Sequence, residues 1–213
     1  MPDKQETLID LLEGAVARRA DEQVLRFRKG ENWAGITGRE LQQRVKSLAA
    51  GLHSLGIKKG DAVALLAEGG PLWTITDFAI LSLGAINIPF YPTQAIHQVE
   101  YILEESKPAL LFLSGEKLAR RVGPVLDRFP DLRLASFEPL KRFPSALVLE
   151  NIERQGADLL TNRPTLYEEL SSQVKASDLA SIIYTSGTTG EPKGVMLAHS
   201  NIVFNAIASG EYL

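Results

Sequence analysis

The first part of the chain shows two different spacings of apolar residues. Between residues 7 and 19, apolar side chains recur at the three-to-four-residue spacing of one helix face, which predicts an amphipathic helix. Two short apolar runs at 24–27 and 33–36 then flank a turn rich in Gly, Glu and Asn, which predicts a β-hairpin. These leading elements are expected to serve packing rather than chemistry.

The middle of the chain alternates strand and helix patterns. Thr37 and Glu40 form a capping-box pair, which predicts a helix that ends at Gly56. The wholly apolar run 62–67 is typical of a parallel strand covered on both faces. Further strands are predicted at 85–88, 109–113, 132–135, 146–149 and 182–184, and helices from Pro71 onward and at 95–106, 117–128, 152–160 and 166–174. This alternation predicts an α/β fold with a mainly parallel sheet flanked by helices, and 136–145 as its loosest connection.

Composition narrows the class of protein. The 213 residues, 45% hydrophobic and 23% charged, suit a folded chain of one large domain or two small ones. A net charge of -3 argues against a surface built for nucleic acid, so no nucleic-acid partner is expected. Because the chain has no cysteine, it can hold no disulfide, thiolate zinc site or cysteine nucleophile, and we expect a cytoplasmic protein.

No segment has the pattern of a membrane span. The first twenty residues mix charges into their apolar positions, unlike a secretory signal. Residues 78–99 form the longest stretch without Asp, Glu, Lys or Arg, but prolines and amides interrupt it, which indicates buried structure in a globular fold. We expect no transmembrane segment, and peripheral membrane contact stays open.

A glycine-rich segment carries the chemistry. Strand 182–184 leads directly into Thr185–Gly194, with glycines at 187, 190 and 194, several hydroxyls and Lys193. Glycines permit positive φ and let amide N–H groups approach an anion, while Lys193 supplies a positive charge. The alternative is a glycine-rich surface turn, but nearly all ten residues suit one chemistry, which favours polyphosphate binding. Pro192 before Lys193 departs from the common nucleoside-triphosphatase loop.

The sequence YTSGTTGEPKGV at 184–195 closely resembles the phosphate-binding signature of the adenylate-forming enzymes. The following MLAHSNIVFN (196–205) resembles the continuation of that signature, and 55–73 and 83–93 resemble N-terminal landmarks of the same family. Within the family, the chain is most similar to the N-terminal part of a long-chain fatty acyl-CoA synthetase. The string EGGPLW at 68–73 departs from that branch and leaves the acyl chain length open.

The resemblance implies a two-step reaction in which ATP converts a fatty acid to acyl-AMP and coenzyme A then displaces AMP. The residues that match the loop holding the β- and γ-phosphates are Thr185, Ser186, Gly187, Thr188, Thr189, Gly190 and Lys193. Mg²⁺ would be shared with the phosphates. In the family, its carboxylate ligand and the catalytic Lys lie downstream, so no catalytic residue and no metal ligand is assigned within this chain.

The chain is therefore expected to be the N-terminal part of the AMP-binding large domain, without the C-terminal domain and inactive alone. We divide it into a leading helix and hairpin (1–36), α/β layers (37–180), and the phosphate-binding loop with the following helix (181–213). ATP and a fatty acid are the expected partners of the complete enzyme, and the oligomeric state is open. The alternative is a stand-alone nucleotide- or protein-binding module of the same fold.

Other polar residues receive structural interpretations. His53 and His97 lack a second histidine at the spacing of metal ligands, so each is expected to have a structural role or to lie on the surface. His199 has either a place near the site or a structural role at the start of a helix capped by Ser200, and it is left out of the catalytic set. The glutamates expected to form a solvated helix face are Glu100, Glu104 and Glu105.

Overall fold

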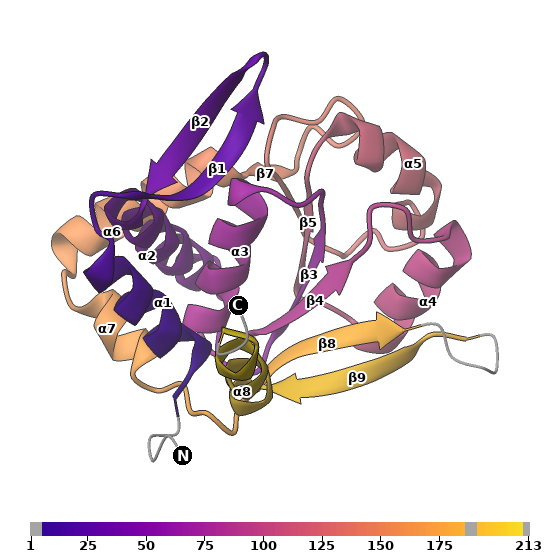
Figure 1. The fold of residues 1–213 in the computed structure, drawn as a ribbon. Coiled ribbons are helices and arrows are strands. Elements are labelled where there is room, and N and C mark those ends of the chain that lie inside the picture. Colours follow the sequence, from indigo (N-terminus) through magenta and orange to yellow (C-terminus); the bar gives the residue numbers. More distant parts are fainter. Residues whose placement is uncertain (1–5, 186–190, 211–213) are drawn as a thin grey trace.

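A computed structural model describes residues 6–185 and 191–210. Its helices are α1 Leu8–Arg18, α2 Gly38–Ser54, α3 Pro71–Ser82, α4 Ile96–Ser106, α5 Glu116–Leu126, α6 Leu149–Asn162, α7 Leu166–Ser171 and α8 His199–Gly210. Its strands are β1 Gln23–Lys29, β2 Asn32–Thr37, β3 Ala62–Leu66, β4 Ile86–Phe90, β5 Leu110–Leu113, β6 Leu134–Ser136, β7 Leu147–Val148, β8 Leu179–Thr185 and β9 Lys193–Ala198. The α/β fold predicted from the sequence is confirmed (Figure 1).

A seven-stranded sheet forms the centre of the molecule, in the order β7-β6-β5-β3-β4-β8-β9. Every neighbouring pair from β7 to β8 is parallel, and only β9 at the edge is antiparallel. The chain starts this sheet at β3, adds β4 on one side and then crosses to place β5 on the other. Ligands of doubly wound sheets bind where the strand order reverses in this way, beyond the carboxyl ends of the strands.

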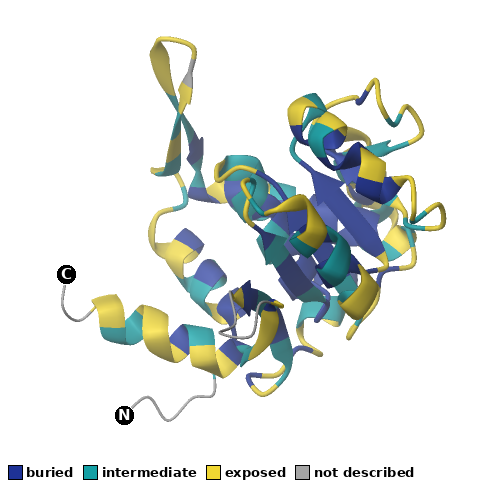
Figure 2. Cartoon of the chain, turned by 90° about the vertical axis from the view of Figure 1, so that its right-hand side faces the viewer, coloured by how far each residue is buried: buried dark blue, intermediate teal, exposed yellow. Residues whose placement is uncertain are grey.

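Successive residues of the central strands belong to different cores. Val63 and Leu65 of β3 pack with α2, α3 and α6, whereas Ala64 and Leu66 pack with α4 and α5 on the opposite face. This alternation follows from the two-residue period of a strand. Because both faces are covered, β3 and β5 are apolar at every position, and Figure 2 shows the central strands dark blue between helices whose outer faces are exposed.

The helix starts follow the sequence signals closely. Of the predicted capping box at α2, the described contacts include the bond from the Glu40 amide to the Thr37 hydroxyl but not the reciprocal bond to the Glu40 carboxylate, whereas Thr7 caps α1 in a complete box with Asp10 that was not predicted. Pro71 occupies the first turn of α3, where no intrahelical N–H bond is needed. The β-hairpin at β1 and β2 is also confirmed, and it projects from the helical layer (Figure 1).

The end of the predicted strand 146–149 differs from the structure. β7 is only two residues long, and Leu149 begins α6. Leu149 is 2% exposed and packs in the core, so its apolar character serves the helix. An apolar residue at a strand-to-helix junction fits either element, because burial alone does not distinguish the two.

Helices α2 and α6 approach closely through two glycines. A Cβ atom placed on Gly156 of α6 would lie 1.8 Å from the Ser47 carbonyl oxygen of α2, and one placed on Gly51 would lie 2.1 Å from the Ile152 carbonyl oxygen. Real Cβ atoms do not make such contacts. The two backbones therefore touch, and each glycine is required by the space available rather than by its φ angle.

Among the described helices, none is both long enough and apolar enough to cross a membrane.

Candidate functional site

The hairpin of β8 and β9 carries the two ends of the predicted phosphate-binding loop. Figure 1 shows the two strands side by side, and their register pairs Thr185 of β8 with Lys193 of β9. Antiparallel partners have Cα atoms roughly 4.5–5.5 Å apart, so the fold brings these two predicted site residues together. The other predicted site residues, Ser186, Gly187, Thr188, Thr189 and Gly190, lie outside the described residues.

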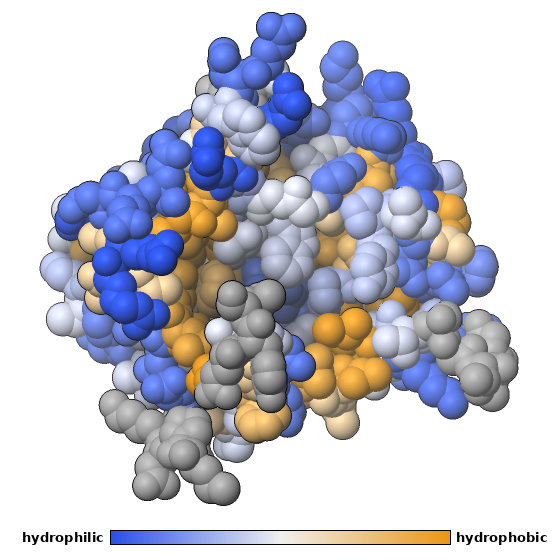
Figure 3. All heavy atoms as spheres, in the orientation of Figure 1, coloured by the Kyte–Doolittle hydropathy of each residue, from blue (hydrophilic) through white to orange (hydrophobic). Residues whose placement is uncertain are grey.

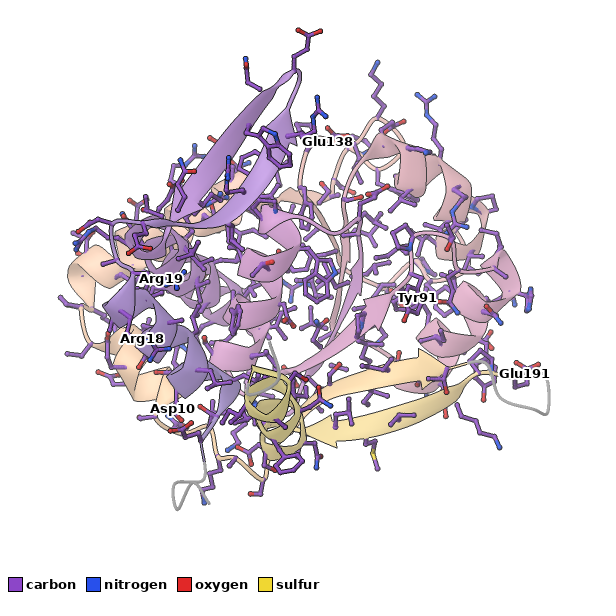
Figure 4. All side chains as sticks on the ribbon, in the orientation of Figure 1. Asp10, Arg18, Arg19, Tyr91, Glu138 and Glu191 are labelled. Atoms are coloured by element: carbon purple, nitrogen blue, oxygen red, sulfur yellow. The ribbon has the colours of Figure 1, made fainter. Side chains whose placement is uncertain are left out.

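Thr185 and Lys193 are both exposed, so their polar groups are available to a ligand. Within residues 6–185 and 191–210, no carboxylate forms an ion pair with the Lys193 ammonium group. Glu191 is exposed at the same end of the hairpin, and Tyr91 follows the neighbouring strand β4 (Figure 4). This end of the hairpin therefore offers a hydroxyl and a cation at the carboxyl edge of the sheet.

Gly194 has a different role from the one expected. Its φ is not among the positive values of the described glycines, so the predicted positive φ at this position is wrong. A Cβ atom on Gly194 would lie 2.9 Å from the Ile182 side chain and 3.3 Å from the Tyr184 ring. Gly194 therefore lets β9 lie tightly against the side chains of β8, which fixes the path of the hairpin beside the loop.

Tyr184 anchors the hairpin in the core below the loop. Its ring is 7% exposed and belongs to the core formed with α4 and α5. Burial, and then the neighbouring Glu105 carboxylate, raise the pKa of the Tyr184 phenol far above its ordinary value. Tyr184 therefore stays protonated and acts as a packing residue that holds the position of Thr185 beside it.

The opposite end of the hairpin is fixed by His199. This side chain is fully buried, and its Nδ1 accepts a hydrogen bond from the Leu8 amide at 3.3 Å. Burial lowers the pKa of His199, and the acceptor role requires a neutral ring. The structural interpretation is thus supported. The cap proposed for Ser200 is wrong, since α8 begins at His199 and the Ser200 amide donates to the Ala176 carbonyl.

The acidic face of α4 is only partly solvated. Glu104 and Glu105 are exposed as expected. Glu100 is largely buried and forms an ion pair with Arg128, just beyond the end of α5. The expectation for Glu100 is wrong because Arg128 is far away in the sequence and only the α4–α5 packing brings it near. His53 is half-buried and His97 exposed, away from any cluster of metal ligands among the described residues.

A polar contact marks the point where the strand order reverses. Glu68 follows β3 and Ser114 follows β5, and the Ser114 hydroxyl donates to the Glu68 carboxylate. Beside them, the Glu138 carboxylate accepts a hydrogen bond from the Glu116 amide at the start of α5 (Figure 4). These carboxylates satisfy local donors. In the sequence each of these residues stands alone after a different strand, so no local pattern indicated these hydrogen bonds.

A second polar pair that the sequence did not reveal lies behind the hairpin. Asp77 of α3 accepts a hydrogen bond of 2.6 Å from the Asn87 amide of β4. The sequence contained one indication of this pair, since Asp77 is the only charged residue within α3. An isolated acid among the apolar residues of a buried helix indicates a partner or a function.

Comparisons with known proteins give the family and the fold of the chain. A model of the family described as AMP-binding enzyme matches residues 12–212. The long-chain-fatty-acid--CoA ligase FadD15 of Mycobacterium tuberculosis is 34% identical over 171 residues, which are 80% of this chain and 28% of that protein. The chain thus spans little more than a quarter of the length of that relative.

Two solved structures are similar in fold. The long-chain-fatty-acid-CoA ligase FadD1 from Archaeoglobus fulgidus has a TM-score of 0.78 at 22% identity, covering 96% of this chain and 38% of that one. A fatty acyl-adenylate ligase from Legionella pneumophila, in complex with acyl adenylate and pyrophosphate, has a TM-score of 0.64 at 28% identity, covering 95% of this chain and 32% of that one. The chain belongs to the AMP-binding enzyme family, whose members are the adenylate-forming ligases.

Proposed function

We propose that this chain is the N-terminal part of the large domain of an AMP-forming long-chain fatty acid–CoA ligase. The observation that carries the proposal is the pairing of Thr185 with Lys193 at the two ends of the loop signature. The fatty acyl-CoA ligase relatives support the fatty acid as substrate. Residues 1–36, 37–180 and 181–213 would then supply the leading elements, the α/β layers and the phosphate loop.

In the proposed reaction, a fatty acid carboxylate oxygen attacks the α-phosphorus of ATP. The bond from that phosphorus to the bridging oxygen breaks, and pyrophosphate leaves with the electron pair. The sulfur of coenzyme A then attacks the acyl carbon, and AMP leaves. Thr185, Lys193 and the loop between them would hold the β- and γ-phosphates, so their donors stabilise the charge that grows on the leaving pyrophosphate.

Mg²⁺ is the cation that the family pairs with these phosphates. In the part of the chain that the structure describes, no cluster of three or more His, Cys, Asp or Glu could hold a metal ion. Because Mg²⁺ on nucleotide phosphates usually takes only one or two protein ligands, we assign no Mg²⁺ ligand among the described residues and derive no step through the ion. The charge that this chain itself offers to the phosphates is the Lys193 ammonium group.

The test uses a longer protein that contains this chain and follows acid-dependent exchange of labelled pyrophosphate into ATP. Lys193→Ala should slow the exchange by about 10²–10³-fold, the usual effect of removing one donor to a developing charge. Lys175→Ala is the matched control, since Lys175 is also exposed and lies just before the other end of β8. Equal rates for the two variants would contradict the proposal.

The hydroxyls of the loop can be tested in the same assay. Valine in place of Thr188 or Thr189 preserves the shape of the side chain and removes the donor, so the exchange should slow with no change in unfolding. Normal exchange by both variants would exclude a role for the hydroxyls.

Residues 1–213 alone distinguish the ligase fragment from the stand-alone module. The fragment should bind ATP weakly and show no acid-dependent exchange, because holding one end of ATP without its reacting partner gives little acceleration. Saturable ATP binding without exchange would favour the binding module. Acid-dependent exchange by the purified chain would overturn the fragment proposal.

A further inference from the structure

A cavity of about 400 Å³ lies behind the hairpin, between α1, α3, α8 and strands β4, β8 and β9. Its walls are mainly apolar and include Trp73, Phe78, Leu81, Ile183 and Leu197. Figure 3 shows hydrophobic residues gathered on this side of the molecule, along α1 and over β8 and β9. Such a volume and lining are typical of a site for a small organic ligand.

Asp77 and Asn87 give this cavity a polar end. The Asn87 Nδ2 group donates to Asp77 Oδ1 at 2.6 Å, which fixes the orientation of the amide. The Asn87 side chain is 1% exposed, and its Oδ1 has no hydrogen-bond partner among the described residues. The nearby Ser181 hydroxyl donates to the Asn87 backbone carbonyl, so it does not serve the side chain.

The polar end also has an uncompensated negative charge. In the part of the chain that the structure describes, no Lys, Arg or His lines the cavity or pairs with Asp77. Burial raises the pKa of the Asp77 carboxyl to about 6, and the Asn87 hydrogen bond offsets this only in part. At pH 7.5 the carboxylate remains the main form, and this half-buried carboxylate has no positive partner among the described residues.

The chemistry of the missing partner follows from these groups. Asp77 Oδ2 and Asn87 Oδ1 are both acceptors, so a ligand must bring donors. The carboxylate calls for a cation, and the apolar walls call for a hydrocarbon or aryl body. A carboxylate or phosphate group brings neither the donors nor the positive charge. The cavity therefore differs in ligand class from the phosphate-binding end of the same hairpin.

We propose that the cavity binds a small primary ammonium compound with an apolar body, whose ammonium group donates to Asp77 and Asn87. A saturable organic-cation site would thus lie beside the acid-activating machinery of the proposed enzyme, without depending on its activity. The proposal concerns the described residues of this chain and can be tested on residues 1–213.

The test compares three probes of equal length by calorimetry at pH 7.5: n-hexylammonium, n-hexanol and n-hexanoate. Hexylammonium should bind at least about tenfold more tightly than hexanol, because hydrogen bonds to charged groups contribute roughly 1.5–3 kcal/mol. Hexanoate should bind most weakly. Equal binding of hexylammonium and hexanol, tighter binding of hexanoate, or no saturable binding of hexylammonium would each overturn the proposal.

Variants assign the binding to the cavity. Asp77→Asn should weaken hexylammonium binding about tenfold or more and change hexanol binding little, since the new amide oxygen can still accept from Asn87. Asp158→Asn, an exposed aspartate on α6, is the matched control and should bind as the wild type does. Ile202→Phe, which fills the cavity from the half-buried face of α8, should weaken all three probes. Unchanged hexylammonium binding in Asp77→Asn or in Ile202→Phe would contradict the assignment.

Discussion

The contact between α2 and α6 predicts that one methyl group at Gly156 will destabilise the protein. In Gly156→Ala the added Cβ would lie 1.8 Å from the Ser47 carbonyl oxygen, whereas ordinary contact begins at 3.4 Å. The two helices must separate by about 1.6 Å at this point. The two groups that the new Cβ would meet, the Ser47 carbonyl and the Gly51 amide, belong to the backbone of α2, so no side-chain rotation can relieve the clash.

The magnitude follows from two opposing effects. Overpacking of a core costs about 1–3 kcal/mol, and separation of two backbones lies at the upper end of that range. Alanine is a better helix former than glycine by about 1 kcal/mol, which offsets part of the loss. We expect a net loss of about 2 kcal/mol in the free energy of unfolding, measured by urea denaturation followed by circular dichroism.

Gly14→Ala provides a control with the same chemical change and the opposite expected effect on the free energy of unfolding. Gly14 lies in the middle of α1, and an added Cβ would meet only the flexible Arg18 guanidinium at 3.4 Å. This variant should gain about 0.5–1 kcal/mol from helix propensity alone. If Gly156→Ala were as stable as Gly14→Ala, the inferred backbone contact would be wrong.

Three further predictions concern charge. Asp77→Asn should raise the free energy of unfolding at pH 7.5 by up to about 3 kcal/mol. The raised pKa of Asp77 stabilises the wild-type fold fully below pH 3.8, and this contribution is lost as the pH rises through about 6. Urea titrations of both proteins from pH 4 to 7.5 check this prediction. His199→Asn keeps an acceptor for Leu8 and removes a group of lowered pKa, so the loss of wild-type stability below pH 6.5 should shrink in thermal melts. Lys193→Ala and Lys175→Ala should unfold within about 0.5 kcal/mol of wild type, as exposed residues do.

The parallel sheet could be predicted from the sequence because both of its faces are covered. Residues 62–66 and 110–113 are apolar at every position, and that pattern leaves few alternatives to a buried parallel strand. The cap at Thr37 is an equally local signal. Element ends such as Leu149 were not predictable, since an apolar residue at a junction serves a strand or a helix equally well.

The sequence marks Thr185 and Lys193 as candidate site residues, but it does not indicate the contacts that support them. Thr185 and Lys193 belong to one local signature, and their pairing follows from the hairpin. The contact of His199 with Leu8 joins residues 191 positions apart, and the pair of Asp77 with Asn87 joins a helix to a strand. No local pattern encodes either contact, because only the packing of distant elements brings the partners together.

The attachment of β8 to the rest of the sheet affects how the two ends of the predicted phosphate-binding loop are held. A single register pair, Asn87 with Ser181, joins β8 to the parallel strands, and residues 182–185 pair with β9 alone. The outer half of β8 is therefore held by side-chain packing, with Ile182 and Tyr184 against the core formed with α4 and α5, rather than by ladder hydrogen bonds to β4. The spacing between Thr185 and Lys193 is set by their mutual pairing, so it depends on β9 and not on hydrogen bonds to β4.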